Sequence, residues 1–402
     1  MRPLSFCMVT TFYPPYHFGG DAVFVHRLVQ ALAGRGHSVD VVHSVGAYRL
    51  QHEGEPELPF SDHPNVTRHE LGSRGDRWRL LAAHQLGRPA FLAGELQSVL
   101  EARNYDVIHF HNVSLMGGPG VLRLGSGVKL YTAHEYWLVC PTHVLFAFGR
   151  EACTEKKCLA CTLHARRPPQ LWRYTGLLGD CLDEVDRLLV PSAFALEEHR
   201  KAGIEAAMQV LPHFVPSPQD GPQPPSEDLP ERAFFLYAGR LEGLKGIEEL
   251  LELFSRYREA DLVIAGSGSL ERALRERARD LPHVRFLGAV HPSELGSYYR
   301  AAVAAIVPSL CYETFGLSAA EALMHGTPVV VRRIGALTEI VEQSGGGLTF
   351  SSAEECREAM ESLRTDPDRR SRLAESGRRA ARALWSEAAH LEAYLGLIGE
   401  LL

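Results

Sequence analysis

Short apolar runs alternate with longer amphipathic stretches along the first half of the chain. The runs are nearly continuous in apolar residues, which is typical of strands buried on both faces of a parallel sheet. A glycine loop and an amphipathic helix (19–37) follow the first run, and the alternation then continues. The pattern predicts a doubly wound α/β domain, with strands at "LSFCMVT" (4–10), "SVDVVHSV" (38–45), "YDVIHFHN" (105–112), "VKLYTAH" (128–134) and "DRLLVPS" (186–192).

The alternation stops at residues 212–232, "PHFVPSPQDGPQPPSEDLPER", which hold seven prolines and little apolar content. This composition is typical of a linker. The pattern then restarts with a helix at 246–257 and strands at "AFFLYAGR" (233–240), "ADLVIAGSG" (260–268), "VRFLGAV" (284–290), "AAVAAIVPS" (301–309) and "GTPVVV" (326–331).

We therefore expect two Rossmann-like domains, 1–211 and 233–384, joined by the linker 212–232. A final amphipathic helix, 385–402, is expected to pack on either domain, including back on the first. Two such domains would face each other across a central cleft lined by the carboxyl ends of their strands.

Length and charge narrow the class of protein. A chain of 402 residues is long enough for two full cores, and no apolar run approaches the roughly 18 residues of a membrane span. The start, "MRPLSFCMVTTF", has too short an apolar part for a signal peptide, so we interpret it as the first strand. The net charge is −7 and no basic tract stands out, which argues against a nucleic-acid partner. Eight cysteines in a chain without an export signal predict that the protein is located in the reducing cytoplasm.

The stretch "ETFGLSAAE" (313–321) places two glutamates eight positions apart around a predicted strand-to-helix turn. Glu313 falls in the loop and Glu321 about one turn into the helix, with Phe315, Gly316 and Leu317 at the helix N-terminus. Unpaired backbone N–H groups and the helix dipole make such a turn suited to phosphate. Two glutamates on an ordinary protein surface would give the same pattern, so this stretch alone does not identify a phosphate site.

Two cations follow the first strand of the second domain. "YAGRLEGLKG" (237–246) carries Arg240 and Lys245 in a glycine-rich loop, where a guanidinium and an ammonium suit a diphosphate. "IAGSGS" (264–269), with Gly266, is a second glycine-rich strand exit. Gly19 and Gly20 allow close backbone approach to a ligand after the first strand, although a lone pair of glycines is common in turns.

Taken in order, these pieces resemble the retaining glycosyltransferases of family 4, which have the GT-B fold. The resemblance rests on the glycine pair after strand one, "TAHE", "GRLxxxKG", "AGSGS", "VRFLGAV" and E-x7-E followed by "ALMHGTPVV". It covers nearly the whole chain and is clearest over residues 237–335.

The resemblance implies roles for individual residues. Glu321 would hold the donor's ribose and Glu313 the transferred sugar, while Arg240 and Lys245 would grip the pyrophosphate with backbone N–H groups of Gly316 and Leu317. Also implied are His134 at the reacting sugar and donor contacts by Gly19, Gly20, Gly266, Val290 and Phe315. For His109 and His111 of "HFHN", a role in the core or in hydrogen bonding is at least as well supported as a role in the site.

Such an enzyme needs no metal for catalysis, because protein cations stabilise the leaving diphosphate. The one D-x-D match, "DPD" (366–368), lies where Asp366 or Asp368 would cap a helix. A separate feature is the cysteine-rich insertion 140–164, with Cys140, Cys153, Cys158 and Cys161. Four cysteines in this spacing favour a structural Zn²⁺ site; iron–sulfur ligation, a redox disulfide and unliganded thiols stay open.

The sequence thus predicts a cytoplasmic retaining transferase of the hexosyl type that moves a sugar from a nucleoside diphosphate, UDP above all, to a hydroxyl acceptor. A nucleotide-sugar epimerase and a non-catalytic sugar-nucleotide-binding protein are the alternatives. The acceptor, a glycan, glycolipid or natural product, is not identified. The variable stretch 47–95 lies in the domain that binds acceptors in the family, and peripheral membrane contact is left open.

Overall fold

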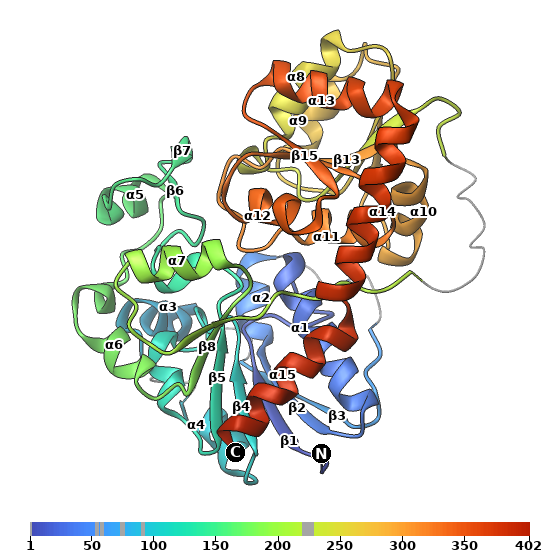
Figure 1. Cartoon of the computed structure of the whole chain (residues 1–402). Coiled ribbons are helices and arrows are strands. Elements are labelled where there is room, and N and C mark those ends of the chain that lie inside the picture. The colour runs from blue at the N-terminus through green and yellow to red at the C-terminus, as the bar shows by residue number, and fades with distance from the viewer. Residues whose placement is uncertain (1, 53–55, 57–59, 73–76, 90–92, 219–228) are drawn as a thin grey trace. The chain divides into compact units, whose positions relative to one another are not determined.

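A computed structural model describes residues 2–52, 56, 60–72, 77–89, 93–218 and 229–402, so part of the predicted linker lies outside the described residues. The chain forms two compact units. Unit 1 comprises residues 1–144, 156–211 and 391–402, and unit 2 comprises residues 145–155 and 212–390. The C-terminal residues 391–402 thus belong to unit 1, and each unit is described by itself (Figure 1).

Unit 1 is built on a parallel sheet with the strand order β3-β2-β1-β4-β5-β8-β9. Its strands are β1 (Ser5–Val9), β2 (Ser38–Ser44), β3 (Val66–Leu71), β4 (Val107–Phe110), β5 (Val128–Thr132), β8 (Arg187–Val190) and β9 (Met208–Val210). Its helices are α1 (Gly19–Gly34), α2 (Val45–Gln51), α3 (Arg77–Leu86), α4 (Ala93–Glu101), η1 (Gly118–Arg123), η2 (Tyr136–Leu138), α5 (Cys158–His164), η3 (Leu171–Tyr174), α6 (Leu177–Leu182) and α7 (Ala193–Lys201).

Unit 2 holds a second parallel sheet, with the order β12-β11-β10-β13-β14-β15. Its strands are β10 (Phe234–Ala238), β11 (Asp261–Ala265), β12 (Val284–Gly288), β13 (Ala304–Val307), β14 (Val329–Arg332) and β15 (Gly347–Phe350), besides the hairpin β6 (Phe146–Ala147) and β7 (Glu151–Ala152). Its helices are η4 (Gly243–Lys245), α8 (Ile247–Arg256), α9 (Glu271–Arg277), α10 (Pro292–Ala301), α11 (Leu317–Met324), α12 (Gly335–Ser344), α13 (Ala353–Thr365) and α14 (Pro367–Leu384). The last helix, α15 (Glu387–Leu401), begins in unit 2 and continues into unit 1.

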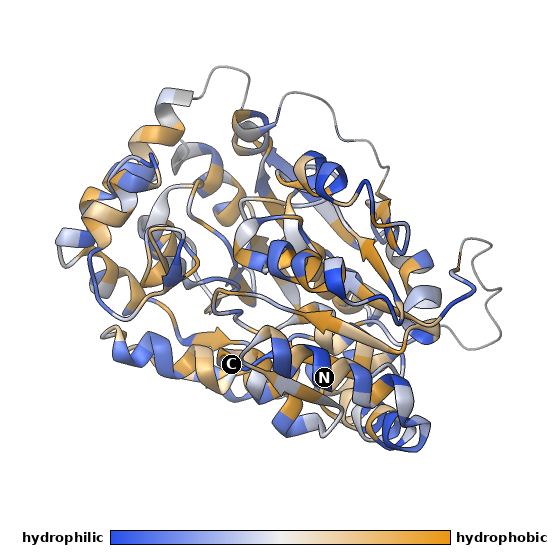
Figure 2. Cartoon of the chain, turned by 90° about the horizontal axis from the view of Figure 1, so that it is seen from above, coloured by the Kyte–Doolittle hydropathy of each residue, from blue (hydrophilic) through white to orange (hydrophobic). Residues whose placement is uncertain are grey.

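Both faces of the unit 2 sheet are buried, as the apolar runs predict. Along β10, Phe235 and Tyr237 join a core with residues of α8 and α13, whereas Phe234 and Leu236 join a second core with residues of α10 and α11. The alternation follows from the two-residue period of a strand. In Figure 2 the strands are mainly hydrophobic and the helices carry hydrophilic and hydrophobic residues side by side.

In unit 1, α15 lies along the sheet (Figure 1). Its Tyr394 is buried, stacks on Phe6 of β1 with ring centroids 6.3 Å apart, and shares a 2.8 Å hydrogen bond with His109 of β4. These contacts fix the last helix on the central strands.

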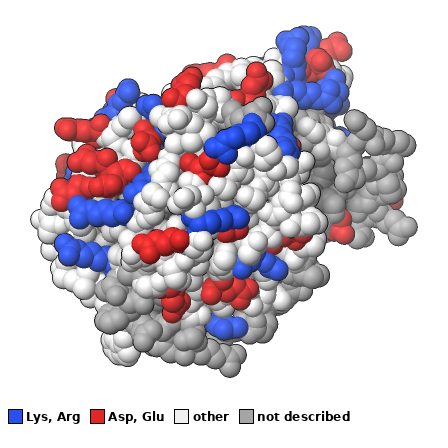
Figure 3. Space-filling model, turned by 90° about the horizontal axis from the view of Figure 1, so that it is seen from below, with Lys and Arg blue, Asp and Glu red and all other residues white. Residues whose placement is uncertain are grey.

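The surface shows the mixture of acidic and basic side chains that the composition predicts. Over the face shown in Figure 3, Lys and Arg lie interspersed with Asp and Glu. None of the helices described in the structure has the length and hydrophobicity that crossing a membrane requires.

Candidate active site

The strand order of unit 2 reverses between β10 and β13, which are hydrogen-bonded neighbours although two strands separate them in sequence. The connections that follow these two strands cross to opposite faces of the sheet. In open α/β sheets, ligands bind beyond the carboxyl ends of the strands at such a switch point. The loops that follow β10 and β13 are the ones that carry Arg240, Lys245 and Glu313.

These two loops bring Lys245 and Glu313 into direct contact. The Lys245 Nζ donates to Glu313 Oε1 at 2.5 Å, and the Ser309 hydroxyl donates to the same oxygen at 2.6 Å. Both charged side chains are largely buried, with 20% of each exposed. The predicted diphosphate ligand and the predicted sugar ligand therefore share one buried cluster.

The electrostatics of the pair keep both groups charged. Burial alone would lower the pKa of Lys245, but the Glu313 carboxylate raises it above its usual value. Burial alone would raise the pKa of Glu313, but the charge of Lys245 and the hydrogen bonds from Lys245 and Ser309 hold it below its usual value. An ammonium and a carboxylate thus coexist here at neutral pH.

Arg240 lies in the same loop and is much more accessible. Its side chain is 51% exposed and contacts Glu242 at 3.0 Å, while its backbone oxygen accepts a 2.6 Å hydrogen bond from the Tyr237 hydroxyl. The Tyr237 contact positions the backbone of the loop and leaves the guanidinium at the surface.

A glycine allows the two loops to approach. Gly246 has φ +69°, and a Cβ at this position would lie 2.1 Å from the backbone oxygen of Pro308. Beside it, the N–H of Leu310 donates to the oxygen of Leu244 at 2.9 Å. Only glycine fits this conformation and this spacing without strain, so Gly246 is what lets Lys245 reach the β13 loop.

The loop after β13 ends at the N-terminus of α11. Gly316 is the N-cap, with φ +105° and no side-chain cap, and Leu317 is the first helical residue. Phe315 is buried against Trp385, with ring centroids 5.8 Å apart. Its side chain therefore belongs to the core, and only its backbone can contribute to a site. Glu321 lies on the first turns of α11 and is partly buried.

Gly266 and Val290 follow the neighbouring strands β11 and β12. The Gly266 N–H donates to the oxygen of Gly288 at 2.7 Å, and the Gly239 N–H donates to Ala265 at 3.0 Å. Val290 is partly buried against the core of unit 2. The ends of three adjacent strands are thereby tied together at the edge where the Lys245–Glu313 pair lies.

Unit 1 has its own switch point, between β1 and β4. Gly19 and Gly20 follow β1, begin α1 and are exposed. His111, after β4, stacks on His134, after the neighbouring strand β5. His134 Nε2 and His111 Nδ1 are 2.9 Å apart. His109 instead faces Tyr394 and Thr132, each at 2.8 Å, so it is a core residue that ties α15 to the sheet.

The structure adds residues that sequence reasoning missed. Ser309, four positions before Glu313, supplies a hydrogen bond that its place at a predicted strand end did not reveal. In unit 1, Glu135 accepts from Asn112 at 3.1 Å and pairs with His143 at 2.7 Å. Burial, and next the Glu135 charge, raise the pKa of Asp21 to about 6. In the sequence, Asp21 follows Gly20 and Glu135 follows His134, two residues that the motifs had already indicated. This adjacency is the only signal by which the sequence could have pointed to the two carboxylates.

The expected zinc site is not supported. Among the residues that the structure describes, no three His, Cys, Asp or Glu side chains converge in a way that could hold a metal ion. Two cysteines of the insertion have polar neighbours instead: Cys140 Sγ contacts the Thr142 hydroxyl at 3.2 Å, and Cys153 Sγ contacts the Glu155 oxygen at 3.4 Å. Burial, followed by repulsion from Cys140, raises the pKa of Cys158, which favours its protonated form. The D-x-D match is a helix cap, since Asp366 Oδ1 accepts from the Arg369 N–H at 2.8 Å.

Comparison with known proteins decides the family. The family model "Glycosyltransferase Family 4" matches residues 18–219, and "Glycosyl transferases group 1" matches residues 223–380. A glycogen synthase of Mycobacterium tuberculosis is 30% identical over 395 residues, covering 92% of this chain and 88% of the relative. The chain belongs to glycosyltransferase family 4. The resemblance inferred from its motifs is confirmed, and the chain is a glycosyltransferase.

Solved structures identify the fold of this family 4 enzyme. Sucrose-phosphate synthase from Thermosynechococcus elongatus superposes with a TM-score of 0.76 at 20% identity, covering 99% of both chains. Anabaena Alr3699/HepE, solved in complex with UDP, gives a TM-score of 0.67 at 15% identity and covers 99% of this chain and all of its own. The enzyme has the GT-B fold, as predicted.

Proposed function

We propose that this glycosyltransferase moves a hexose from a UDP-sugar to a hydroxyl acceptor with retention of the anomeric configuration and without a catalytic metal. The observation that carries the proposal is the Lys245–Glu313 contact at the switch point of unit 2, with Arg240 in the same loop. A fixed cation, a mobile cation and a buried carboxylate at one sheet edge suit a charged diphosphate joined to a hydroxyl-rich sugar.

The cations would act on the leaving group. As the acceptor oxygen bonds to the anomeric carbon, the bond from that carbon to the diphosphate oxygen breaks and negative charge grows on the phosphate. The ammonium of Lys245 stays protonated because Glu313 raises its pKa, and with the Arg240 guanidinium it would stabilise that charge. The acceptor proton passes to the departing phosphate oxygen on the same face, which conserves the configuration.

The remaining donor contacts follow the loops that surround the pair. We assign the ribose to Glu321 and the phosphates to the N–H groups of Gly316 and Leu317 at the N-terminus of α11. Gly266 and Val290, together with the Phe315 backbone, are assigned to the nucleoside. The UDP bound by Anabaena Alr3699/HepE supports uracil as the base.

Residues of unit 1 are proposed to act on the sugar and the acceptor. His134 is assigned to the transferred sugar, and Gly19 and Gly20 to close backbone contact with the donor. Asp21 and Glu135 carry carboxylates beside them, and carboxylates are good acceptors for the hydroxyl groups of an acceptor substrate.

Hydrolysis of nucleotide sugars tests this proposal. UDP-, GDP- and ADP-sugars would be incubated with the enzyme without acceptor, and the released sugar followed by proton NMR before it mutarotates. We expect slow hydrolysis of a UDP-sugar, with the anomeric configuration of the donor in the first product and full activity in the presence of a chelator. Release of the sugar with inverted configuration, or turnover that EDTA abolishes, would contradict the proposed mechanism. Preference for a GDP- or ADP-sugar would contradict the assignment of uracil as the base.

A further inference from the structure

Residues 156–179 of unit 1 are basic and contain no acid. They include Lys156, Lys157, Arg166, Arg167 and Arg173, and the nearest carboxylates are Glu155 before them and Asp180 after them. The chain as a whole has a net charge of −7, whereas these 24 residues carry five Lys and Arg side chains and no carboxylate. The first four of these cations are exposed. Arg173 instead stacks on Trp172, with its guanidinium carbon 4.3 Å from the ring centroid.

The same elements expose large apolar side chains. Leu159 and Leu163 lie one turn apart on α5 and so share a face, Leu171 and Tyr174 belong to η3, and Trp78 and Leu86 belong to α3. Each is between 49% and 76% exposed. Six of the nine large apolar side chains exposed in the described part of the chain therefore lie on three short helices.

Two of these helices are in contact, and the third is joined to them by a short connection. The Trp172 indole of η3 donates to the backbone oxygen of His84 in α3 at 3.0 Å, and six residues link α5 to η3, so the two are at most about 25 Å apart. Figure 1 shows α3, α5 and α6 on the same side of unit 1. We name the exposed side chains of α3, α5 and η3, with the cations of residues 156–167, the basic–apolar face.

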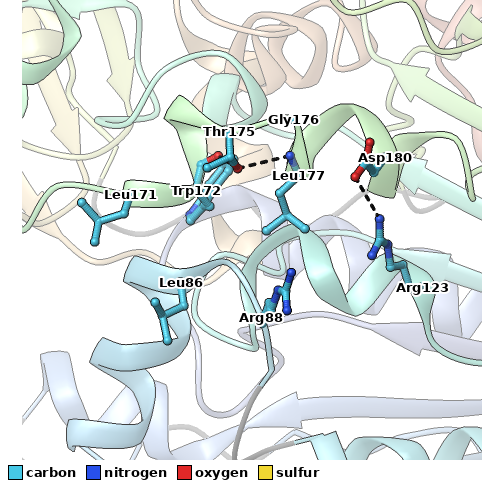
Figure 4. Close-up of a pocket in the computed structure, with 9 residues that line it drawn as sticks. All are labelled: Leu86, Arg88, Arg123, Leu171, Trp172, Thr175, Gly176, Leu177 and Asp180. Atoms are coloured by element: carbon cyan, nitrogen blue, oxygen red, sulfur yellow. Dashed lines mark hydrogen bonds and ion pairs between the residues drawn. The ribbon is translucent and has the colours of Figure 1, made fainter.

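A depression in this region combines the two properties (Figure 4). It has a volume of about 370 Å³, with apolar walls from Leu86, Leu171, Trp172 and Leu177. Arg88 extends toward Leu177 in Figure 4, and Arg123 pairs with Asp180 at 3.4 Å. A guanidinium beside leucine and tryptophan walls suits an anionic group attached to an apolar chain.

We propose that the basic–apolar face docks unit 1 on an anionic lipid bilayer. Long basic side chains can place their charges at lipid headgroups while their stems and the neighbouring leucines enter the interface. Anionic lipids attract such cation clusters. We favour a bilayer over a protein partner, because exposed cations with no carboxylate between them match the charge of anionic headgroups.

Vesicle sedimentation tests the surface directly. The full chain would be mixed with vesicles of phosphatidylcholine alone, or of phosphatidylcholine with phosphatidylglycerol, at low and high salt. We expect binding to the anionic vesicles, weakened by salt, and little binding to the neutral ones. Replacing the apolar pair (Leu159→Ser with Leu163→Ser) should lower the bound fraction about tenfold, since two leucines that would enter the bilayer interface are lost.

Two further variants sharpen the test. Lys156→Gln with Lys157→Gln and Arg166→Gln should weaken binding to anionic vesicles and reduce its salt dependence. Leu384→Ser, an equally exposed leucine of α14 in unit 2, should bind like the unchanged chain. Hydrolysis of nucleotide sugars should be unchanged in all three, which separates this surface from the proposed function.

Three results would overturn the proposal. The unchanged chain could stay in solution with both kinds of vesicle, or the variant at Leu159 and Leu163 could bind as well as the unchanged chain. Light scattering could also show a dimer that the same variant converts to a monomer, in which case the face joins two copies of the chain.

Discussion

The residues of the proposed donor site differ in how deeply the fold depends on them. Arg240 is half exposed and its guanidinium contacts Glu242 in its own loop, so its removal should leave the packing intact. Lys245 neutralises a largely buried carboxylate. Without Lys245, Glu313 would keep the hydrogen bond from Ser309 but lose its ion pair in a poorly solvated place, which is destabilising.

Arg240→Ala should therefore separate catalysis from stability. We expect turnover of the nucleotide sugar to fall about 10²–10³-fold, the scale of one lost transition-state donor, with an unchanged melting temperature. Lys245→Ala should lower turnover by a similar factor and should also lower the melting temperature. Steady-state rates and thermal denaturation of both variants provide the check, and near-normal turnover in Arg240→Ala would remove it from the mechanism.

The pair also has a defined pH window. The lowered pKa of Glu313 means that its contribution to stability is present above the unfolded value and is lost as the pH falls through the folded value. The raised pKa of Lys245 means that its contribution is lost only as the pH rises through that raised value. Between these limits, which include neutral pH, the contribution of the pair is constant.

At the scale of elements, the order of strands and helices was predictable from apolar periodicity, whereas contacts between distant loops were not. The predicted strands at 4–10, 233–240 and 301–309 correspond to β1, β10 and β13. Edge strand β3 was missed because its sequence, "VTRHEL", is polar and largely exposed. Helix α3, within the stretch 47–95, has too weak an apolar period to be predicted, and helix α4, which begins at the end of that stretch, was also missed.

The candidate site shows the same division. Glu313 and Lys245 were each singled out by their local motifs, but their ion pair spans 68 residues. Their contact depends on β10 lying beside β13, which the sequence does not state. The zinc prediction is not supported by the described residues, and cysteine spacing does not show where Cys140 and Cys153 direct their sulfurs. The roles given to individual site residues stay predictions.

The entry to α8 offers a test of how an element shapes the site. Gly246→Ala should strain a left-handed backbone and push Lys245 away from Glu313, because the new Cβ meets the Pro308 oxygen. We expect a loss of about 1–3 kcal/mol in the free energy of unfolding, together with reduced turnover.

Gly243→Ala is the matched control in the same loop. Its added Cβ would meet only the Glu248 Oε2, at an ordinary 3.5 Å. Urea denaturation and steady-state rates should show it close to the unchanged chain. Equal effects at positions 243 and 246 would contradict the close-approach argument.

At the scale of the whole molecule, buried histidines should make the chain sensitive to mild acid. Burial lowers the pKa of His43, His84, His325 and His390 to about 4. The unfolded chain protonates these residues near pH 6.5, so it binds more protons than the folded chain between about pH 6.5 and 4. Stability must then fall as the pH drops through that window, by at most about 1.4 kcal/mol per pH unit for each histidine.

His43 allows this prediction to be tested at one position. It is fully buried, between Tyr13 and Tyr16, and neither ring nitrogen has a hydrogen-bond partner within the described residues. His43→Phe should flatten the pH dependence of the free energy of unfolding between pH 7 and 5 and stabilise the chain at the acid end. Urea denaturation at several pH values gives the slope; a variant with the same slope as the unchanged chain would show that His43 does not titrate there.

The account as a whole depends on unit 2 being the donor site, with Glu321 at the ribose and Glu313 at the sugar. Loss of a ribose ligand should weaken binding of free UDP and of the intact donor alike, by about 1–3 kcal/mol. Loss of a sugar ligand that matters most in the transition state should spare UDP and lower turnover.

Calorimetry with UDP, combined with hydrolysis rates of the UDP-sugar, measures this difference in Glu313→Gln and Glu321→Gln. We predict that Glu321→Gln binds UDP more weakly and that Glu313→Gln keeps the affinity for UDP but loses turnover. Weaker UDP binding in Glu313→Gln with unchanged binding in Glu321→Gln would reverse the roles, and unchanged affinity and rate in both variants would contradict the assignment of the site.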